Sequence, residues 1–164
     1  MKKLIKIAAA QLTPVFLNKE KTIEKACEAI SEAGKNGAEL IVFPEAFISG
    51  YPDWVWLIPN SKGKMLNDLY VRLVENAISV PDDSTDKLCK SAKAAGINVV
   101  MGMNERNTDK SGASLYNSIL FISNEGKIAG IHRKLMPTGG GRLRWAQGNG
   151  TSLRAYDTSA GRLA

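Results

Sequence analysis

The sequence has few of the residues that crosslink small proteins or hold metal ions. It contains two cysteines and one histidine in 164 residues. A disulfide framework needs several cysteines, and a zinc site needs closely spaced cysteine and histidine ligands. Cys27 and Cys89 are therefore expected to be reduced core residues on helices. His132, alone at the end of an expected strand, is expected to be structural, and we expect no metal site.

Long apolar runs and clusters of one charge are also missing. No segment approaches the roughly 20 apolar residues of a membrane span. The apolar start of the chain is interrupted by Lys6 and ended by Gln11, unlike a signal peptide. The net charge of +6 comes from basic residues interleaved with acidic ones, whereas a nucleic-acid surface needs a clustered basic face. We therefore expect a cytoplasmic protein with no membrane and no nucleic-acid partner.

The hydrophobic pattern is typical of an α/β protein. Apolar residues make up 44% of the chain and charged residues 23%, as in ordinary globular domains. Short apolar runs alternate with longer stretches whose apolar residues recur every three or four positions. The pattern predicts strands over residues 4–10, 40–43, 97–101, 114–122, 127–132 and 153–156, and helices over 19–35, 66–78 and 84–95. A tight turn at 124–126 predicts a hairpin between two of the strands.

Two charged residues stand at the ends of expected strands. Glu45 follows the apolar strand 40–43 and Pro44, where loss of water would raise its pKa and suit it to general base catalysis. The alternative is a loop carboxylate bonded to backbone amides. Lys134 follows the strand 127–132, where it either stabilises a developing negative charge or is an ordinary solvated lysine. The local sequence leaves these alternatives open.

Aromatic residues follow Glu45 in the chain. Tyr51, Trp54 and Trp56 either line an apolar substrate pocket or belong to the core. The glycine-rich segments 139–141 and 148–150 lack the spacing and the strand-then-helix setting of phosphate-binding loops. We therefore expect these two segments to be turns.

Three longer motifs carry a family resemblance. They are Leu-Ile-Val-Phe-Pro-Glu-Ala-Phe at 40–47, His-Arg-Lys-Leu-Met-Pro-Thr at 132–138 and Arg-Leu-Arg-Trp-Ala-Gln-Gly at 142–148. Together with the opening segment 6–11 and the closing segment 156–163, they resemble the nitrilase branch of the carbon–nitrogen hydrolase superfamily. The resemblance covers essentially the whole chain. It implies an α-β-β-α sandwich in which residues 1–164 are the N-terminal part of a single domain, ending before the nucleophile strand.

The resemblance also implies a catalytic set of a glutamate base, a lysine and a cysteine nucleophile, with no cofactor. Glu45 and Lys134 match the first two by motif. The family cysteine follows the Gly-Arg-Leu turn, and the sequence ends at Ala164 before reaching it. Gly141 stands where family members usually carry a second glutamate, and Arg144 stands where they tend to be apolar. We therefore expect the 164-residue chain to be inactive alone.

The resemblance favours one function among three. The preferred hypothesis is a nitrilase that converts a small nitrile, with an aromatic or apolar substituent contacted by Tyr51 and Trp54, to a carboxylic acid and ammonia. The second is an amidase or carbamoylase of the same superfamily, using the same residues on an amide. The third is a non-catalytic truncated fragment or interaction module. In the complete form a homo-oligomer is expected.

Overall fold

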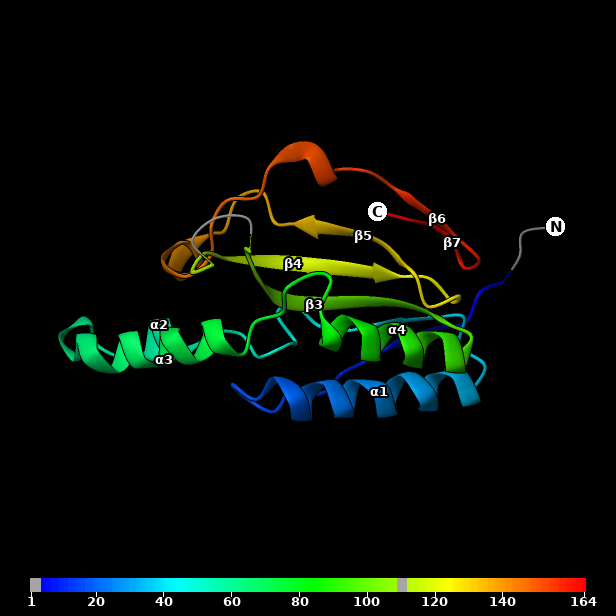
Figure 1. Ribbon diagram of the computed structural model, residues 1–164, viewed down its shortest axis with the longest axis horizontal. Helices are drawn as coiled ribbons and strands as arrows, with labels where there is room; N and C mark the ends of the chain where they lie inside the picture. The colour runs from blue at the N-terminus through cyan, green and yellow to red at the C-terminus, as the bar shows by residue number, and fades with distance from the viewer. Residues whose placement is uncertain (1–3, 109–111) are drawn as a thin grey trace.

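A mixed β-sheet forms the centre of the computed structural model, which describes residues 4–108 and 112–164. The sheet has five strands in the order β1-β2-β3-β4-β5 (Figure 1). They are β1 Ile7–Ala9, β2 Leu40–Val42, β3 Asn98–Arg106, β4 Leu115–Ile122 and β5 Ile128–Arg133. β1, β2 and β3 run parallel, whereas β3, β4 and β5 are antiparallel neighbours. The α/β class predicted from the sequence is confirmed.

Two helices lie against one face of this sheet (Figure 1). They are α1 Lys19–Lys35 and α4 Asp83–Ala95. The side chain of Asn18 caps α1 by accepting a hydrogen bond from the amide of Lys21, and Asp82 and Thr85 form a reciprocal capping box at the start of α4. Both helices lie within connections between parallel strands, which need long crossovers rather than tight turns.

The main hydrophobic core fills the space between this sheet face and the two helices. Alternate residues of β3 are fully buried there: Val99, Met101 and Met103. Leu88 of α4 is equally buried against them. Because side chains alternate along a strand, Val100 and Gly102 face the other side of the sheet.

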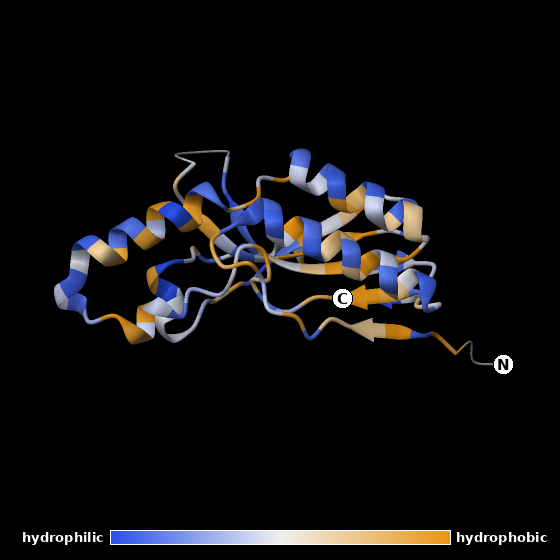
Figure 2. Ribbon diagram, turned by 90° about the horizontal axis from the view of Figure 1, so that it is seen from below, coloured by the Kyte–Doolittle hydropathy of each residue, from blue (hydrophilic) through white to orange (hydrophobic). Residues whose placement is uncertain are grey.

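A second helical region extends from one end of the sheet. It consists of α2 Trp54–Leu57, the 3-10 helix η1 Asn60–Lys62 and α3 Gly63–Glu75. These segments pack around a second hydrophobic cluster that contains Trp54, Leu73 and Trp145. Figure 2 shows hydrophobic and hydrophilic residues interspersed along the helices, as expected where one side is buried. Helix α2 was not predicted, because a single turn is too short to show helical periodicity.

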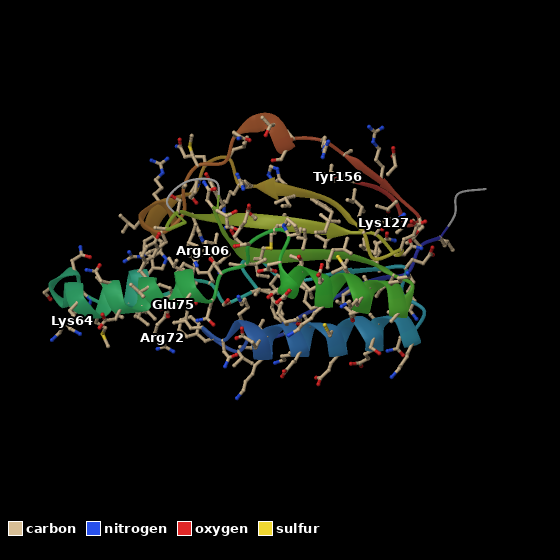
Figure 3. All side chains as sticks on the ribbon, viewed as in Figure 1. Lys64, Arg72, Glu75, Arg106, Lys127 and Tyr156 are labelled. Carbon is tan, nitrogen blue, oxygen red and sulfur yellow. The ribbon has the colours of Figure 1, made fainter. Side chains whose placement is uncertain are left out.

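The last part of the chain lies over the sheet face opposite α1 and α4 (Figure 1). The 3-10 helices η2 Gly139–Leu143 and η3 Gly150–Ser152 lead to a hairpin of β6 Tyr156–Thr158 and β7 Gly161–Leu163. Tyr156 points from β6 toward the sheet (Figure 3), with its ring centroid 4.7 Å from that of Phe121. A Cβ on Gly130 would overlap this tyrosine ring, so the glycine allows the hairpin to approach β5 closely.

The elements differ from the predicted ones mainly at their ends. The hairpin between β4 and β5 is confirmed, with Gly126 at a φ of 75° in its turn. β1 is shorter than predicted, β6 begins only at Tyr156, and α3 begins and ends three residues early. β3 continues five residues beyond its predicted end at Met101, and the last three of these are polar residues that the apolar pattern did not mark as strand. Among the described residues, no helix has both the length and the apolar character needed to span a bilayer.

Truncation of Leu88 tests the packing of the helical layer on the sheet. Leu88→Ala removes a side chain with no exposed surface and is expected to lower the free energy of unfolding by about 2–5 kcal/mol. Val71→Ala on α3 is the control, because Val71 is 53% exposed, and it should change stability by less than about 0.5 kcal/mol. Urea denaturation measures both. Equal effects of the two variants would contradict the assignment of the core.

Candidate active site

Glu45 lies in the loop that leaves β2, and this loop is held close to β3. The amide of Phe43 donates a hydrogen bond to the carbonyl of Val100 at 2.9 Å, which continues the strand pairing by one residue. A Cβ at position 102 would overlap the carbonyl oxygen of Pro44. Gly102 therefore permits the close approach that places Glu45 over the sheet.

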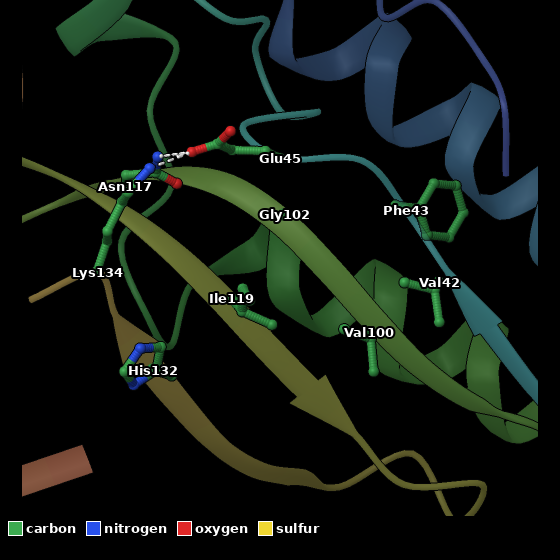
Figure 4. Close-up of a pocket in the computed structure, with 9 residues that line it drawn as sticks. All are labelled: Val42, Phe43, Glu45, Val100, Gly102, Asn117, Ile119, His132 and Lys134. Atoms are coloured by element: carbon green, nitrogen blue, oxygen red, sulfur yellow. Dashed lines mark hydrogen bonds and ion pairs between the residues drawn. The ribbon is translucent and has the colours of Figure 1, made fainter. Parts of the chain in front are cut away.

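Glu45 and Lys134 are brought together by the fold, although 89 positions separate them in the chain. Lys134 directly follows β5, and its Nζ donates to Oε1 of Glu45 at 2.8 Å. Asn117 of β4 donates to the same oxygen through Nδ2 at 2.6 Å (Figure 4). The structure thus joins a carboxylate, an ammonium and an amide at the ends of β2, β4 and β5.

The carboxylate of Glu45 is held in its charged form. Partial burial acts to raise its pKa, but the hydrogen bonds from Lys134 and Asn117, together with the lysine charge, outweigh burial and lower the pKa below its ordinary value. The raised pKa expected from the sequence is therefore wrong. The apolar neighbours were visible in the sequence, whereas the two donors come from distant strands.

Asn104 of β3 ties together the two loops that flank this pair. Its Nδ2 donates to the carbonyl oxygens of Ile48 and Gly50 at 3.2 and 3.0 Å, in the loop that follows Glu45. Its Oδ1 accepts a hydrogen bond from Nε1 of Trp145 at 2.9 Å, in the loop that follows Lys134. Asn104 has no exposed surface. One buried amide therefore fixes both loops relative to the sheet.

A buried ion pair fixes the end of β5 next to Lys134. Glu105 is 2% exposed and accepts hydrogen bonds from the guanidinium of Arg133, including one from Nε to Oε2 at 2.9 Å. Ser118 of β4 donates to the same carboxylate at 2.7 Å.

Sequence reasoning missed Asn104, Glu105 and Asn117. Polar residues within or next to apolar strand segments were the available signal, because such residues are rarely buried without partners.

A cavity of about 340 Å³ opens beside Glu45 and Lys134, on the sheet face opposite α1 and α4. Glu45 and Lys134 lie at one end of it (Figure 4). Its other lining residues come from the sheet and from the end of β2: Val42, Phe43, Val100, Gly102, Asn117, Ile119 and His132. The site therefore combines a charged end with a mostly apolar wall.

The structure does not bring the predicted aromatic residues into this cavity. Trp54 is 5% exposed and packs in the second hydrophobic cluster, with its ring edge-on to Phe16. Tyr51 packs edge-on against Trp145, with ring centroids 5.3 Å apart. Trp56 is 61% exposed and covers Gly139 and Gly140. Substrate contact by Tyr51 or Trp54 stays a prediction.

Neither cysteine lies at this site. Cys27 on α1 and Cys89 on α4 both pack against the main core, on the other face of the sheet from the cavity. Burial raises the pKa of both thiols, which disfavours the reactive thiolate. The described residues also contain no group of three or more histidine, cysteine or acidic side chains that could hold a metal ion.

The loop after Lys134 has little room at Gly141. This glycine is buried, and a Cβ there would lie 3.0 Å from the ring of Trp145. A larger residue would require the tryptophan to shift. Arg144 places its guanidinium 5.4 Å from the ring centroid of Tyr70. The positive charge of Arg144 therefore lies against α3 and not in the cavity.

The sequence and structure were compared with known proteins. The family model described as "Carbon-nitrogen hydrolase" matches residues 6–164. "Nitrilase 2" of an unknown prokaryotic organism is 40% identical, over 98% of this chain and 50% of that protein. "Aliphatic nitrilase" of Rhodococcus rhodochrous is 39% identical, over 97% of this chain and 40% of that protein. The chain thus spans about half the length of the curated relatives it matches.

Solved structures agree on the fold. An amidase from Nesterenkonia sp. superimposes with a TM-score of 0.64, at 18% identity, over 88% of this chain and 48% of that one. At this identity the likeness shows the fold alone.

Substitution of Gly102 tests whether close approach of the loop positions Glu45. Gly102→Ala is expected to push residues 44–46 away from β3 and to cost about 1–3 kcal/mol of stability through overpacking. Gly63→Ala is the matched control, because nothing lies within 4 Å of a Cβ at that position. Chemical denaturation and a crystal structure of each variant measure the effects. An unmoved loop in the Gly102 variant would refute the constraint.

The lowered pKa of Glu45 predicts a pH-dependent contribution to stability. A carboxylate whose pKa is lowered by folding stabilises the native state above its ordinary pKa, and this contribution is lost as the pH falls through the lowered value. The advantage of the wild type over Glu45→Gln should therefore be present at neutral pH and fade in acid. It should not exceed about 1 kcal/mol, because solvent screens this half-exposed pair.

Thermal melts from neutral to acidic pH measure this difference. Glu75→Gln, on the exposed side of α3 (Figure 3), is the control substitution. A difference between wild type and Glu45→Gln that grows in acid would contradict the direction of the pKa change.

Proposed function

The chain belongs to the carbon–nitrogen hydrolase family, in its nitrilase branch, and from that membership we propose that it supplies the base and the lysine of a nitrilase active site. One observation carries the proposal. The carboxylate of Glu45 and the ammonium of Lys134 lie 2.8 Å apart at the end of a mostly apolar cavity. An ionised base beside a fixed positive charge is the arrangement that thiol activation and oxyanion stabilisation need.

The proposed reaction adds two water molecules to a nitrile. Glu45 takes the proton of a cysteine thiol, and the sulfur bonds to the nitrile carbon while the nitrile nitrogen gains a proton, giving a thioimidate. Water then adds to this carbon, and the carbon–nitrogen bond breaks to release ammonia and leave a thioester. A second water breaks the carbon–sulfur bond, which frees the carboxylic acid and restores the thiol. Glu45 carries the protons between these steps.

Lys134 stabilises the negative charge of the tetrahedral intermediates. Its Nζ donates to Glu45 at 2.8 Å, and its backbone amide donates to the carbonyl of Asn117 at 2.8 Å. Preorganised charge of this kind requires no rearrangement during the reaction. The thiol comes from outside these 164 residues, since Cys27 and Cys89 lie on the other face of the sheet. We therefore propose that the chain alone is inactive.

The substrate is proposed to be a small nitrile with an apolar or aromatic substituent. Val42, Val100 and Ile119 supply the apolar wall of the cavity beside the charged pair. An amide substrate is the alternative within the family, because the same residues serve both reactions. The cytoplasmic location and the homo-oligomer expected from the sequence stay predictions.

Ammonia release tests the proposed function. The 164-residue chain is compared with a fusion in which it replaces the matched portion of the 40% identical Nitrilase 2. Substrates are benzonitrile and butyronitrile, each beside its amide. The chain alone should release no ammonia, whereas the fusion should release it from the nitriles. Glu45→Gln in the fusion should lower kcat/KM by about 10²–10⁴-fold, the usual contribution of a general base; Glu75→Gln should not.

Other results would favour other functions. Release from the amides only would favour the amidase, and no release by a fusion that melts cooperatively would favour a non-catalytic protein. Glu45-dependent release by the chain alone would mean that another nucleophile exists and that the mechanism is wrong.

A further inference from the structure

We propose that Asn117 is a positioning residue that orients Glu45 so that Oε2 accepts the thiol proton; this inference rests on the proposed function. Nδ2 of Asn117 and Nζ of Lys134 both donate to Oε1, at 2.6 and 2.8 Å. Oε2 has no hydrogen-bond or ion-pair partner in the part of the chain that the structure describes. The two donors thereby occupy one oxygen and leave the other available as the base.

Asn117 is suited to this role because it is itself fixed. It lies within β4, pairs with Asn104 of β3 and is 5% exposed. Its backbone carbonyl accepts the amide hydrogen of Lys134 at 2.8 Å. A single residue therefore bonds to both members of the charged pair, to Glu45 through its side chain and to Lys134 through its backbone.

The ion pair alone would not orient the carboxylate. The side chains of Lys134 and Glu45 are 40% and 48% exposed, and pairs exposed to this degree contribute little and hold long side chains weakly. A buried amide on a central strand has far less freedom than a lysine side chain. Asn117 supplies the fixed direction, and Lys134 supplies the charge.

The amide also affects the charge state of Glu45 without adding a charge of its own. Its hydrogen bond is one of the causes that lower the pKa of Glu45 against the opposing effect of burial. Without this donor, the effect of burial, which raises the pKa of Glu45, is opposed by Lys134 alone, so the pKa should rise. Replacement by a carboxylate should raise it further, because two neighbouring negative charges repel.

Carboxyl-carbon NMR of the 164-residue chain tests the hydrogen bond without requiring activity. Glutamate side chains are labelled with ¹³C, and the Glu45 signal is assigned by its loss in Glu45→Gln. The titration midpoint of Glu45 should rise in Asn117→Ser and rise further in Asn117→Asp. Asn98→Ser is the matched control, because Asn98 is also a buried asparagine of the sheet, in β3 opposite Leu40 of β2, and its side-chain amide donates to Glu39 and Ser159 instead. It should leave the midpoint unchanged.

An unchanged midpoint in both Asn117 variants would overturn the proposal. So would loss of the fold in both of them while Asn98→Ser stays folded, because Asn117 would then be a purely structural residue. In the nitrilase fusion, Asn117→Ser should lower kcat/KM about 10- to 100-fold, as expected for a misplaced base, and move the acidic limb of its pH profile upward. A fusion that releases no ammonia would refute the proposed function, while the titration would still decide the role of Asn117.

Discussion

Buried polar side chains on β3 and β4 hold the two loops that carry the charged pair. A polar group removed from water must find partners, and the side chains of Asn104 and Asn117 find theirs in the loops beyond the sheet. Asn104 binds backbone carbonyls of one loop and the indole of Trp145 in the other. Asn117 binds both Glu45 and Lys134. These contacts link the loops that follow β2 and β5 to the same two strands of the sheet.

This arrangement explains how an exposed ion pair keeps a defined geometry. The pair itself is half exposed, and such pairs add little stability. Its geometry comes from the sheet beneath it: Gly102 lets the Glu45 loop approach β3, and the Glu105–Arg133 pair fixes the end of β5. Buried polar groups in the sheet thus hold the carboxylate of Glu45 and the ammonium of Lys134 in place on the face opposite α1 and α4.

The charged pair and the two cysteines of this chain lie on opposite faces of the sheet. This chain carries a carboxylate and a lysine in contact, but both of its thiols lie across the sheet, where burial raises their pKa. Gly141 occupies a tight site beneath Trp145, where the family resemblance leads one to expect a glutamate. Restoring an acidic residue there would therefore require a compensating change in the position of the tryptophan.

The sequence by itself determined the α/β class, most helices and strands, and the family. It also identified Glu45 and Lys134 as candidate site residues. These depend on hydrophobic periodicity, capping residues and local motifs, which are properties of neighbours along the chain. Only the tertiary structure decided the lowered pKa of Glu45, the extension of β3 through Asn104 and Glu105, and the placement of Tyr51 and Trp54 away from the cavity. Each of these depends on partners from distant segments, and no local pattern records which distant donor will satisfy a buried or half-buried group.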